Sequence, residues 1–144
     1  MKFLAPTMTR MKANLNQIPI SQSMAKNMSD EAELMRQLDI QLSHVWMVRT
    51  FLKHSDEAEE DEELALVHRR LYDFALALGS HLNEGDAEGY WKQANKKWRR
   101  LKAACELFVE IQPEVSNHTN FKMAAMSLQK AVSEIGHLLG KQDA

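Results

Sequence analysis

The side chains most suited to chemistry in this sequence are six histidines, because an imidazole can bind a metal ion or move a proton near neutral pH. Carboxylate-bridged dimetal sites in helical bundles need a Glu and a Glu-x-x-His pair on paired helices, all directed inward. Only Glu134 and His137 have that spacing. At about 100° per residue, Glu134 falls beside the apolar stripe of its helix and His137 nearly opposite it. We therefore keep this pair as a weak candidate and predict neither a metal nor a cofactor.

A catalytic nucleophile is the second kind of chemistry to consider. Cys105 is the only cysteine, it lies on an apolar stripe, and no His occupies a nearby position on the same helix to activate its thiol. The sequence also lacks a G-x-S-x-G elbow and a phosphate-binding glycine loop, which leans against an enzyme. A single thiol fits a reducing compartment, so we expect a cytoplasmic protein without a membrane span.

Basic side chains are concentrated on the solvent side of the helix predicted at residues 87–112. If this helix is antiparallel to the one before it, two arginines of that preceding helix come level with its middle and widen the patch. Such a patch can bind an acidic protein, an anionic surface or nucleic acid. Nucleic acid is less favoured, because the domain is acidic and no exposed aromatic platform accompanies the cations. The predicted anion- or partner-binding residues are Arg69, Arg70, Lys92, Lys96, Arg99 and Arg100, with Lys97 and Lys102 at the flanks.

The helix predicted at residues 30–54 carries apolar side chains outside its core stripe. Ile40, Met47 and Phe51 lie there, with His44 between them, where the surface of a helix is normally polar. Exposed apolar stripes usually bind a partner. Either the N-terminal tail folds over this side or a second subunit covers it. We predict an oligomer interface formed by Ile40, His44, Met47 and Phe51.

Four apolar stripes with helical spacing determine where these side chains lie. The chain has 144 residues, enough for one domain, and its few Gly and Pro residues favour helix. Helices joined by short loops must be antiparallel neighbours, so we predict an all-α fold, an antiparallel up-down-up-down four-helix bundle. The predicted core of the third helix is Trp91, Ala94, Trp98, Leu101, Cys105 and Phe108. The predicted elements are a flexible basic tail at residues 1–28 and helices at about 30–54, 56–80, 87–112 and 119–140.

Charged and conformationally special residues set the predicted helix ends. Residues 56–63 contain seven acids in eight positions, and unsatisfied backbone N–H groups at a helix N-terminus favour negative charge. Asp30 with Glu33 three residues later has the spacing of a capping box. The predicted caps are Asp30, Ser55 or Asp56, and Asn117 or Thr119, and the predicted ends are Gly79, Pro113 and Gly140.

Taken together, the patterns favour a small non-enzymatic protein that works by protein–protein interaction. We expect a homo-oligomer formed through the 30–54 helix, and an anionic partner for the cationic surface of the 87–112 helix. The first alternative is an anion- or nucleic-acid-binding module, whose affinity falls steeply with added salt. The second alternative is a metal-dependent enzyme that uses surface or interfacial His and Glu side chains.

Overall fold

All regular secondary structure in the described part of the chain is helical, which confirms the all-α prediction. The structure is a computed structural model that describes residues 22–141, with side chains from Asp30 onward. No strand occurs in this range, and each of its helices is too short or too polar to cross a bilayer. The chain divides into two compact units, Met1–Asp30 and Glu31–Ala144, and the contacts below all lie in the second. The helices are α2 (Gln22–Lys53), α3 (Glu57–Glu60), α4 (Glu62–Asn83), α5 (Ala87–Val115) and α6 (Thr119–Leu138).

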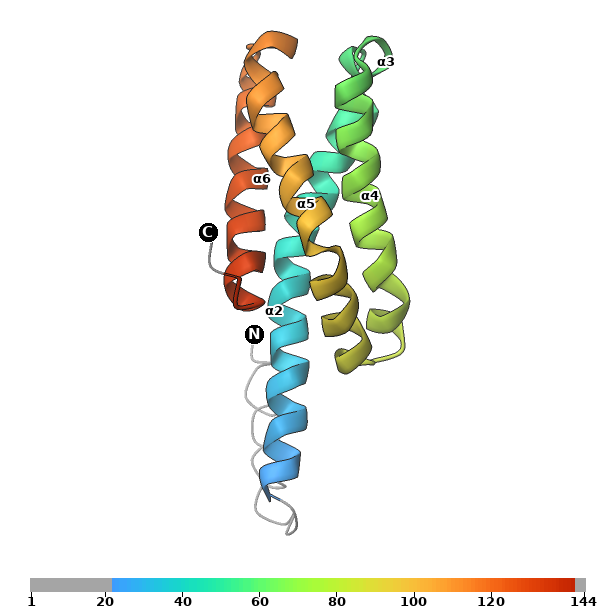
Figure 1. Cartoon of the computed structure of the whole chain (residues 1–144), viewed down its shortest axis with the longest axis vertical. Helices are drawn as coiled ribbons and strands as arrows, with labels where there is room; N and C mark the ends of the chain where they lie inside the picture. The colour runs from blue at the N-terminus through green and yellow to red at the C-terminus, as the bar shows by residue number, and fades with distance from the viewer. Residues whose placement is uncertain (1–21, 142–144) are drawn as a thin grey trace, which may run out of the picture. The chain divides into compact units, whose positions relative to one another are not determined.

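In the second unit, α2, α4, α5 and α6 lie side by side, and each runs opposite to the long helix before it (Figure 1). α4 packs along α5, and α5 packs along α6. α2 contacts α4 through Trp46 and Tyr72, whose ring centroids are 5.9 Å apart. It contacts α6 through Phe51 and Phe121, which meet edge to face with centroids 5.0 Å apart. Side chains from all four helices therefore enclose one core.

The core is built from the apolar positions that recur every three or four residues. On α5, Ala94, Leu101 and Phe108 are buried at the positions that the periodicity predicts, as is Cys105. Trp98 is half-buried and covers the edge of the core instead of lying inside it, and Trp91 does the same. A large indole can shield apolar neighbours while one edge stays in water.

Tyr90 is the largest fully buried side chain of the described residues, although the periodicity does not single it out. Its hydroxyl donates a hydrogen bond to Oδ1 of Asp39 at 2.9 Å, which connects α5 to α2. Burial and the nearby charge of Asp39 both raise the pKa of Tyr90. The phenol therefore stays protonated and keeps its donor.

α2 begins earlier than the sequence predicts. It is helical from Gln22, so the flexible tail predicted for residues 1–28 gives way to helix over its last residues, while residues 1–21 lie outside the described part. Asp30 consequently lies within the helix and caps nothing. Glu33, predicted to complete the cap, accepts hydrogen bonds from side chains of the next turn instead. The segment before Asp30 has no Gly or Pro after residue 21, so nothing in it opposes extension of the helix.

The acidic run forms two helices, where the sequence predicted one continuous helix at 56–80. Asp61 is extended, with φ −117° and ψ 113°, and separates α3 from α4. Its Oδ1 accepts a hydrogen bond from the backbone N–H of Leu64 at 2.9 Å. Asp61 is therefore the cap of the long helix. The predicted pair lies at the start of α3 instead, where Asp56 is the cap residue by position and the Ser55 hydroxyl accepts a hydrogen bond from the backbone N–H of Ala58 at 3.3 Å. A carboxylate that satisfies a free N–H of the first turn also lies at the positive end of the helix dipole.

Two residues predicted to end helices lie inside them. α4 continues through Gly79 to Asn83, and the chain turns at Gly85, whose φ of 67° lies in the left-handed region that favours glycine. α5 continues through Pro113 to Val115. A proline lacks an N–H group and its ring crowds the carbonyl four residues before it, but here only two helical residues follow Pro113, so little helix is disturbed.

α6 begins and ends on different kinds of residue. Its cap is His118, whose Nδ1 accepts a hydrogen bond from the backbone N–H of Asn120 at 3.0 Å, rather than the predicted Asn117 or Thr119. The prediction that Gly140 ends the helix is correct, because Gly140 follows the last turn with a φ of 75°.

Candidate functional site

A groove between α4 and α5, which we call the cationic groove, brings three basic side chains together. Arg70 enters it from α4, and Lys97 and Arg100 enter it from α5, where a spacing of three residues places both on one side of the helix. The groove has a volume of about 240 Å³. Asp73 and the exposed Leu76 also line it. The groove therefore combines concentrated positive charge with an apolar side chain.

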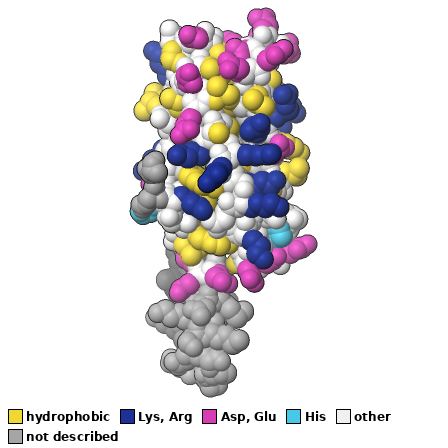
Figure 2. Space-filling view, viewed as in Figure 1, with side chains coloured by type: hydrophobic (Ala, Val, Ile, Leu, Met, Phe, Trp, Pro, Cys, Tyr) yellow, Lys and Arg dark blue, Asp and Glu magenta, His cyan; other side chains and the backbone are white. Residues whose placement is uncertain are grey.

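The cations of the groove have no ionic partner among residues 30–141. Arg70, Lys97 and Arg100 form no ion pair in this range, whereas the neighbouring Lys102 pairs with Glu106 at 3.6 Å. Figure 2 shows Lys and Arg side chains gathered across the middle of the face formed by α4 and α5. Clustered like charges raise the local potential and attract anions.

The remaining predicted cations lie outside the groove. Lys92, Lys96 and Arg99 are exposed on the solvent side of α5. Arg69 is exposed on α4 and lies near His68, whose pKa is lowered by burial and then by nearby cations, among them Arg69. Two of the predicted cations thus line the groove, together with a lysine that the sequence placed at the flank. The helical spacing predicts which cations share one side of α5, but it does not show which side of α5 faces α4.

The apolar residues predicted as an oligomer interface on α2 lie in two environments. Ile40 is 47% exposed and Met47 is 64% exposed, and His44 is exposed between them. Phe51 is half-buried and packs against Phe121 at the edge of the core. The structure therefore leaves a shorter apolar stripe open to solvent than the one predicted.

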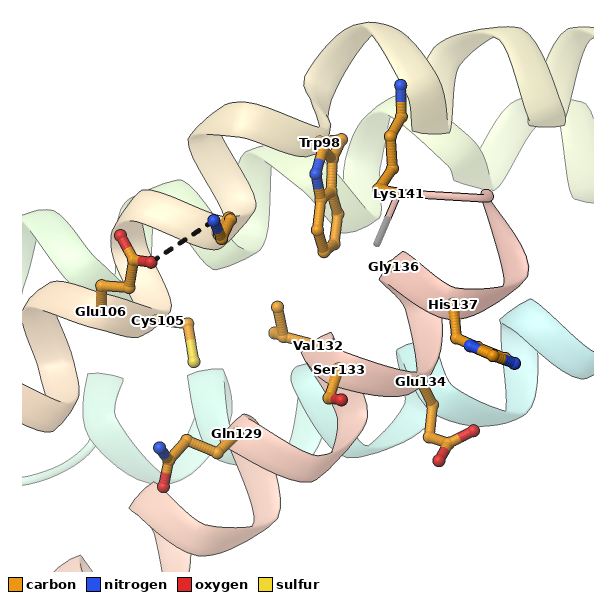
Figure 3. Close-up of a pocket in the computed structure, with 11 residues that line it drawn as sticks. Trp98, Cys105, Glu106, Gln129, Val132, Ser133, Glu134, Gly136, His137 and Lys141 are labelled. Carbon is orange, nitrogen blue, oxygen red and sulfur yellow. Dashed lines mark ion pairs between the residues drawn. The ribbon is translucent and has the colours of Figure 1, made fainter. Parts of the chain in front are cut away.

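A larger hollow, of about 700 Å³, lies between α5 and α6 (Figure 3). Trp98 forms one of its walls and lies against Gly136, where a Cβ atom would come within 2.6 Å of the indole ring. Cys105 borders the same hollow. Burial, with the charge of Glu106, raises the pKa of the Cys105 thiol to about 11. Thiolate is therefore scarce near neutral pH, which opposes a role as nucleophile.

Glu134 and His137, the weak metal candidates, point away from Trp98 in Figure 3. Glu134 accepts a hydrogen bond from Lys130 at 2.9 Å, and this bond lowers the pKa of Glu134. His137 is exposed. Within residues 30–141, no further His, Cys, Asp or Glu completes a metal-binding group around them.

The sequence did not point to a group of potential metal ligands in the α4–α5 turn. One ligand atom from each of His81, Glu84 and Asp86 lies within 4.8 Å of the others. Both oxygens of Asp86 are already engaged, because Oδ1 accepts from the backbone N–H of Gly89 at 2.9 Å and Oδ2 accepts from Nδ1 of His81 at 3.0 Å. These bonds, the one from Gly89 first, lower the pKa of Asp86. Asp86 therefore caps α5, and its contact with His81 ties the end of α4 to the start of α5.

Comparisons with known proteins were made at the level of both sequence and fold. Protein-family models, curated proteins and solved structures each gave no match. The function is therefore inferred from the chain's own side chains.

Proposed function

We propose that this chain is an antiparallel four-helix bundle that acts by binding other proteins in the cytoplasm, with the cationic groove meeting an anionic partner. The main support is the convergence of Arg70, Lys97 and Arg100 on one groove, where they outnumber the single acid, Asp73, and form no ion pair with the described residues. Like charges held close together repel one another. An anionic ligand removes that repulsion, so such a groove favours its binding.

An acidic protein segment suits the groove better than nucleic acid does. Leu76 is 60% exposed beside the cations and can pack against an apolar side chain. Single-stranded nucleic acid needs exposed aromatic rings for base stacking. Among the residues with described side chains, Trp46 is the one large exposed aromatic, and it lies on α2 with the Arg49 guanidinium 4.7 Å from its ring. No stacking platform therefore adjoins the groove.

The test is a charge reversal in the groove, measured by fluorescence anisotropy with a labelled helical peptide rich in Glu and Leu. The wild-type protein should bind the peptide, and Lys97→Glu with Arg100→Glu should abolish binding because the groove becomes anionic. Lys122→Glu with Lys130→Glu on α6 makes the same charge change elsewhere and should leave binding intact. Equal loss in both variants would contradict the proposal. Tighter binding of single-stranded DNA than of the peptide would support the nucleic-acid-binding alternative.

A second observation supports self-association through α2, where Ile40 and Met47 are exposed with His44 between them. Covering such a stripe with a second copy removes apolar surface from water. Ile40→Glu with Met47→Glu should convert an oligomer into a monomer in light scattering at high salt, where apolar contacts persist and exposed charges are screened. A variant that remains oligomeric under those conditions would remove α2 from the interface.

A further inference from the structure

The solvent side of α5 carries a line of exposed residues, which we call the charged stripe, and it changes sign at Ala103. Successive members are three or four residues apart, so they follow one side of the helix. From Lys92 onward, the residues before Ala103 are basic and those after it are acidic, whereas Glu88 in the first turn of α5 is an acid. The cationic half contains Lys92, Lys96 and Arg100, and the acidic half contains Glu106, Glu110 and Glu114, all of them exposed.

This order of charges does not stabilise α5 itself. A helix favours acids near its N-terminus and cations near its C-terminus, whereas the last turn of α5 contains Glu114 and no basic residue. Glu106 pairs with Lys102, but a cation placed before its acid is the less favourable order along a helix. Within residues 30–141, neither Glu110 nor Glu114 forms an ion pair. Glu110 and Glu114 therefore have no evident role inside this chain.

We propose that the anionic partner of the cationic surface is the acidic half of the charged stripe in a second copy of this chain. A second α5 laid antiparallel on the first, with a two-fold axis through Ala103, sets each cation opposite an acid, and every contact occurs twice. Ala103 is small and exposed, so the two helices can approach closely at the axis. The pairs between copies are Arg100 with Glu106, Lys96 with Glu110, and Lys92 with Glu114.

α4 repeats the change of sign beside α5. Glu62 lies at its start, Arg70 lies about two turns further along, and Leu66 lies midway. Arg70 shares the cationic groove with Arg100, so one turn toward the acidic end brings the chain to Leu66 on α4 and to Ala103 on α5. A single two-fold axis, perpendicular to both helices, can therefore run past Leu66 and Ala103. Figure 2 shows cations across the middle of this face and acidic side chains at both of its ends, one of which carries α3.

The inference rests on the proposed function, because it names the partner of the same cationic surface. Electrostatic complementarity of this kind favours one orientation and suppresses others. A parallel arrangement of two copies would place like charges together. The contact is consequently specific in direction and sensitive to salt.

Two charge-reversed variants test the proposal by sedimentation velocity. The acid-reversed variant is Glu110→Lys with Glu114→Lys, and the cation-reversed variant is Lys92→Glu with Lys96→Glu. The first variant places cations near the C-terminus of α5 and the second places acids near its N-terminus. The helix dipole favours both placements, so neither variant should weaken the helix. Circular dichroism of each variant verifies that the helices are retained.

The wild-type protein should be a dimer at low ionic strength and dissociate as salt is added, because the screening length falls from about 30 Å at 0.01 M to about 3 Å at 1 M. Each variant alone should be a monomer. An equal mixture of the two should form a heterodimer, in which a largely cationic stripe meets a largely acidic one. The matched control, Lys122→Glu with Lys130→Glu, should dimerise like the wild type.

A wild type that is monomeric at low ionic strength would overturn the proposal, as would a mixture of the variants that gives no heterodimer. A dimer that resists salt and is abolished by Ile40→Glu with Met47→Glu would also overturn it, because that result assigns the interface to α2. If the wild type is monomeric yet binds the acidic peptide through Lys97 and Arg100, this inference fails and the proposed function stands.

Discussion

The residues on the packed side and those on the solvent side of α5 follow the same helical spacing, but neighbouring helices constrain only those on the packed side. On the packed side, Ala94, Leu101 and Phe108 are buried, and the surrounding helices fix the space that each can fill. On the solvent side, Lys96 and Glu110 are exposed, and no other helix limits their size or charge. The packed side therefore determines how α5 folds into the protein, whereas the solvent side determines what can bind to it.

The largest expected effect on the free energy of unfolding comes from a substitution on the packed side, at Phe108, which is fully buried. Phe108→Ala should lower the free energy of unfolding by about 3–5 kcal/mol, because it removes apolar contacts and leaves a cavity. Urea denaturation followed by circular dichroism measures the change. A loss below about 1 kcal/mol would mean that the site collapses or admits water, and the contrast between the two sides would then be weaker than the burial implies.

Packing against α5 should also make two helical glycines behave oppositely. A Cβ at Gly136 would lie 2.6 Å from the Trp98 ring, while one at Gly79 would have no atom within 4 Å. Gly136→Ala should therefore lower the free energy of unfolding by about 1–3 kcal/mol through overpacking. Gly79→Ala, the matched control, should raise it by about 0.5–1 kcal/mol because alanine favours the helix. Thermal unfolding compares the two, and a stabilising Gly136→Ala would show that Trp98 is free to move aside.

A smaller effect is expected at Tyr90, where the packed side of α5 makes a polar contact. Tyr90→Phe removes the hydrogen bond to Asp39 and should lower the free energy of unfolding by about 0.5–1.5 kcal/mol. Asp39 is half-buried and regains water. Tyr72→Phe is the control, because the Tyr72 hydroxyl makes no hydrogen bond to the described residues. Equal effects in chemical denaturation would show that the Tyr90–Asp39 bond adds no stability.

The smallest effect on folding is expected on the solvent side. Lys92→Gln with Lys96→Gln should change the free energy of unfolding by less than about 0.5 kcal/mol, because both side chains are exposed and make no ion pair with the described residues. Denaturation at high salt isolates folding from any association through charge. A loss of more than about 1 kcal/mol would mean that this side also supports the fold, and it would remove the contrast.

The sequence predicts the packed side well because burial repeats with the helix. Leu101 and Phe108 recur on one stripe, and several other segments supply stripes to cover it. Tyr90 was not identified, because its burial depends on a hydroxyl partner on α2, Asp39, which is distant in sequence. Periodicity reports which side of a helix is apolar. It does not report which polar group finds a partner across the core.

Helix ends were harder to predict because several residues of one type compete for the same role. Any of the acids at 56–63 could cap a helix, and only the fold shows that Asp61 bonds the Leu64 N–H. Gly79 and Gly85 are both plausible ends by residue type, yet only Gly85 has a positive φ. The choice depends on where the neighbouring helix begins, which local sequence does not encode.

The candidate site was predicted in part, for the same reason. Arg70 and Arg100 were identified as members of a basic patch, but the groove that joins them to Lys97 depends on how α4 is set against α5. The change of charge at Ala103 is present in the sequence. Its proposed role as a contact between two copies depends on Ala103 being exposed, which the structure shows.

The buried thiol between α5 and α6 allows local opening of this protein to be measured by its rate of alkylation. Cys105 is the single cysteine of 144 residues, so any alkylated molecule carries its label at one known atom. A thiol with a pKa near 11 hardly reacts while it remains buried, and the reaction proceeds mainly from states in which the structure around the hollow has opened. The increase in mass with time in a dilute alkylating reagent therefore reports how often this part of the protein opens, without an added probe.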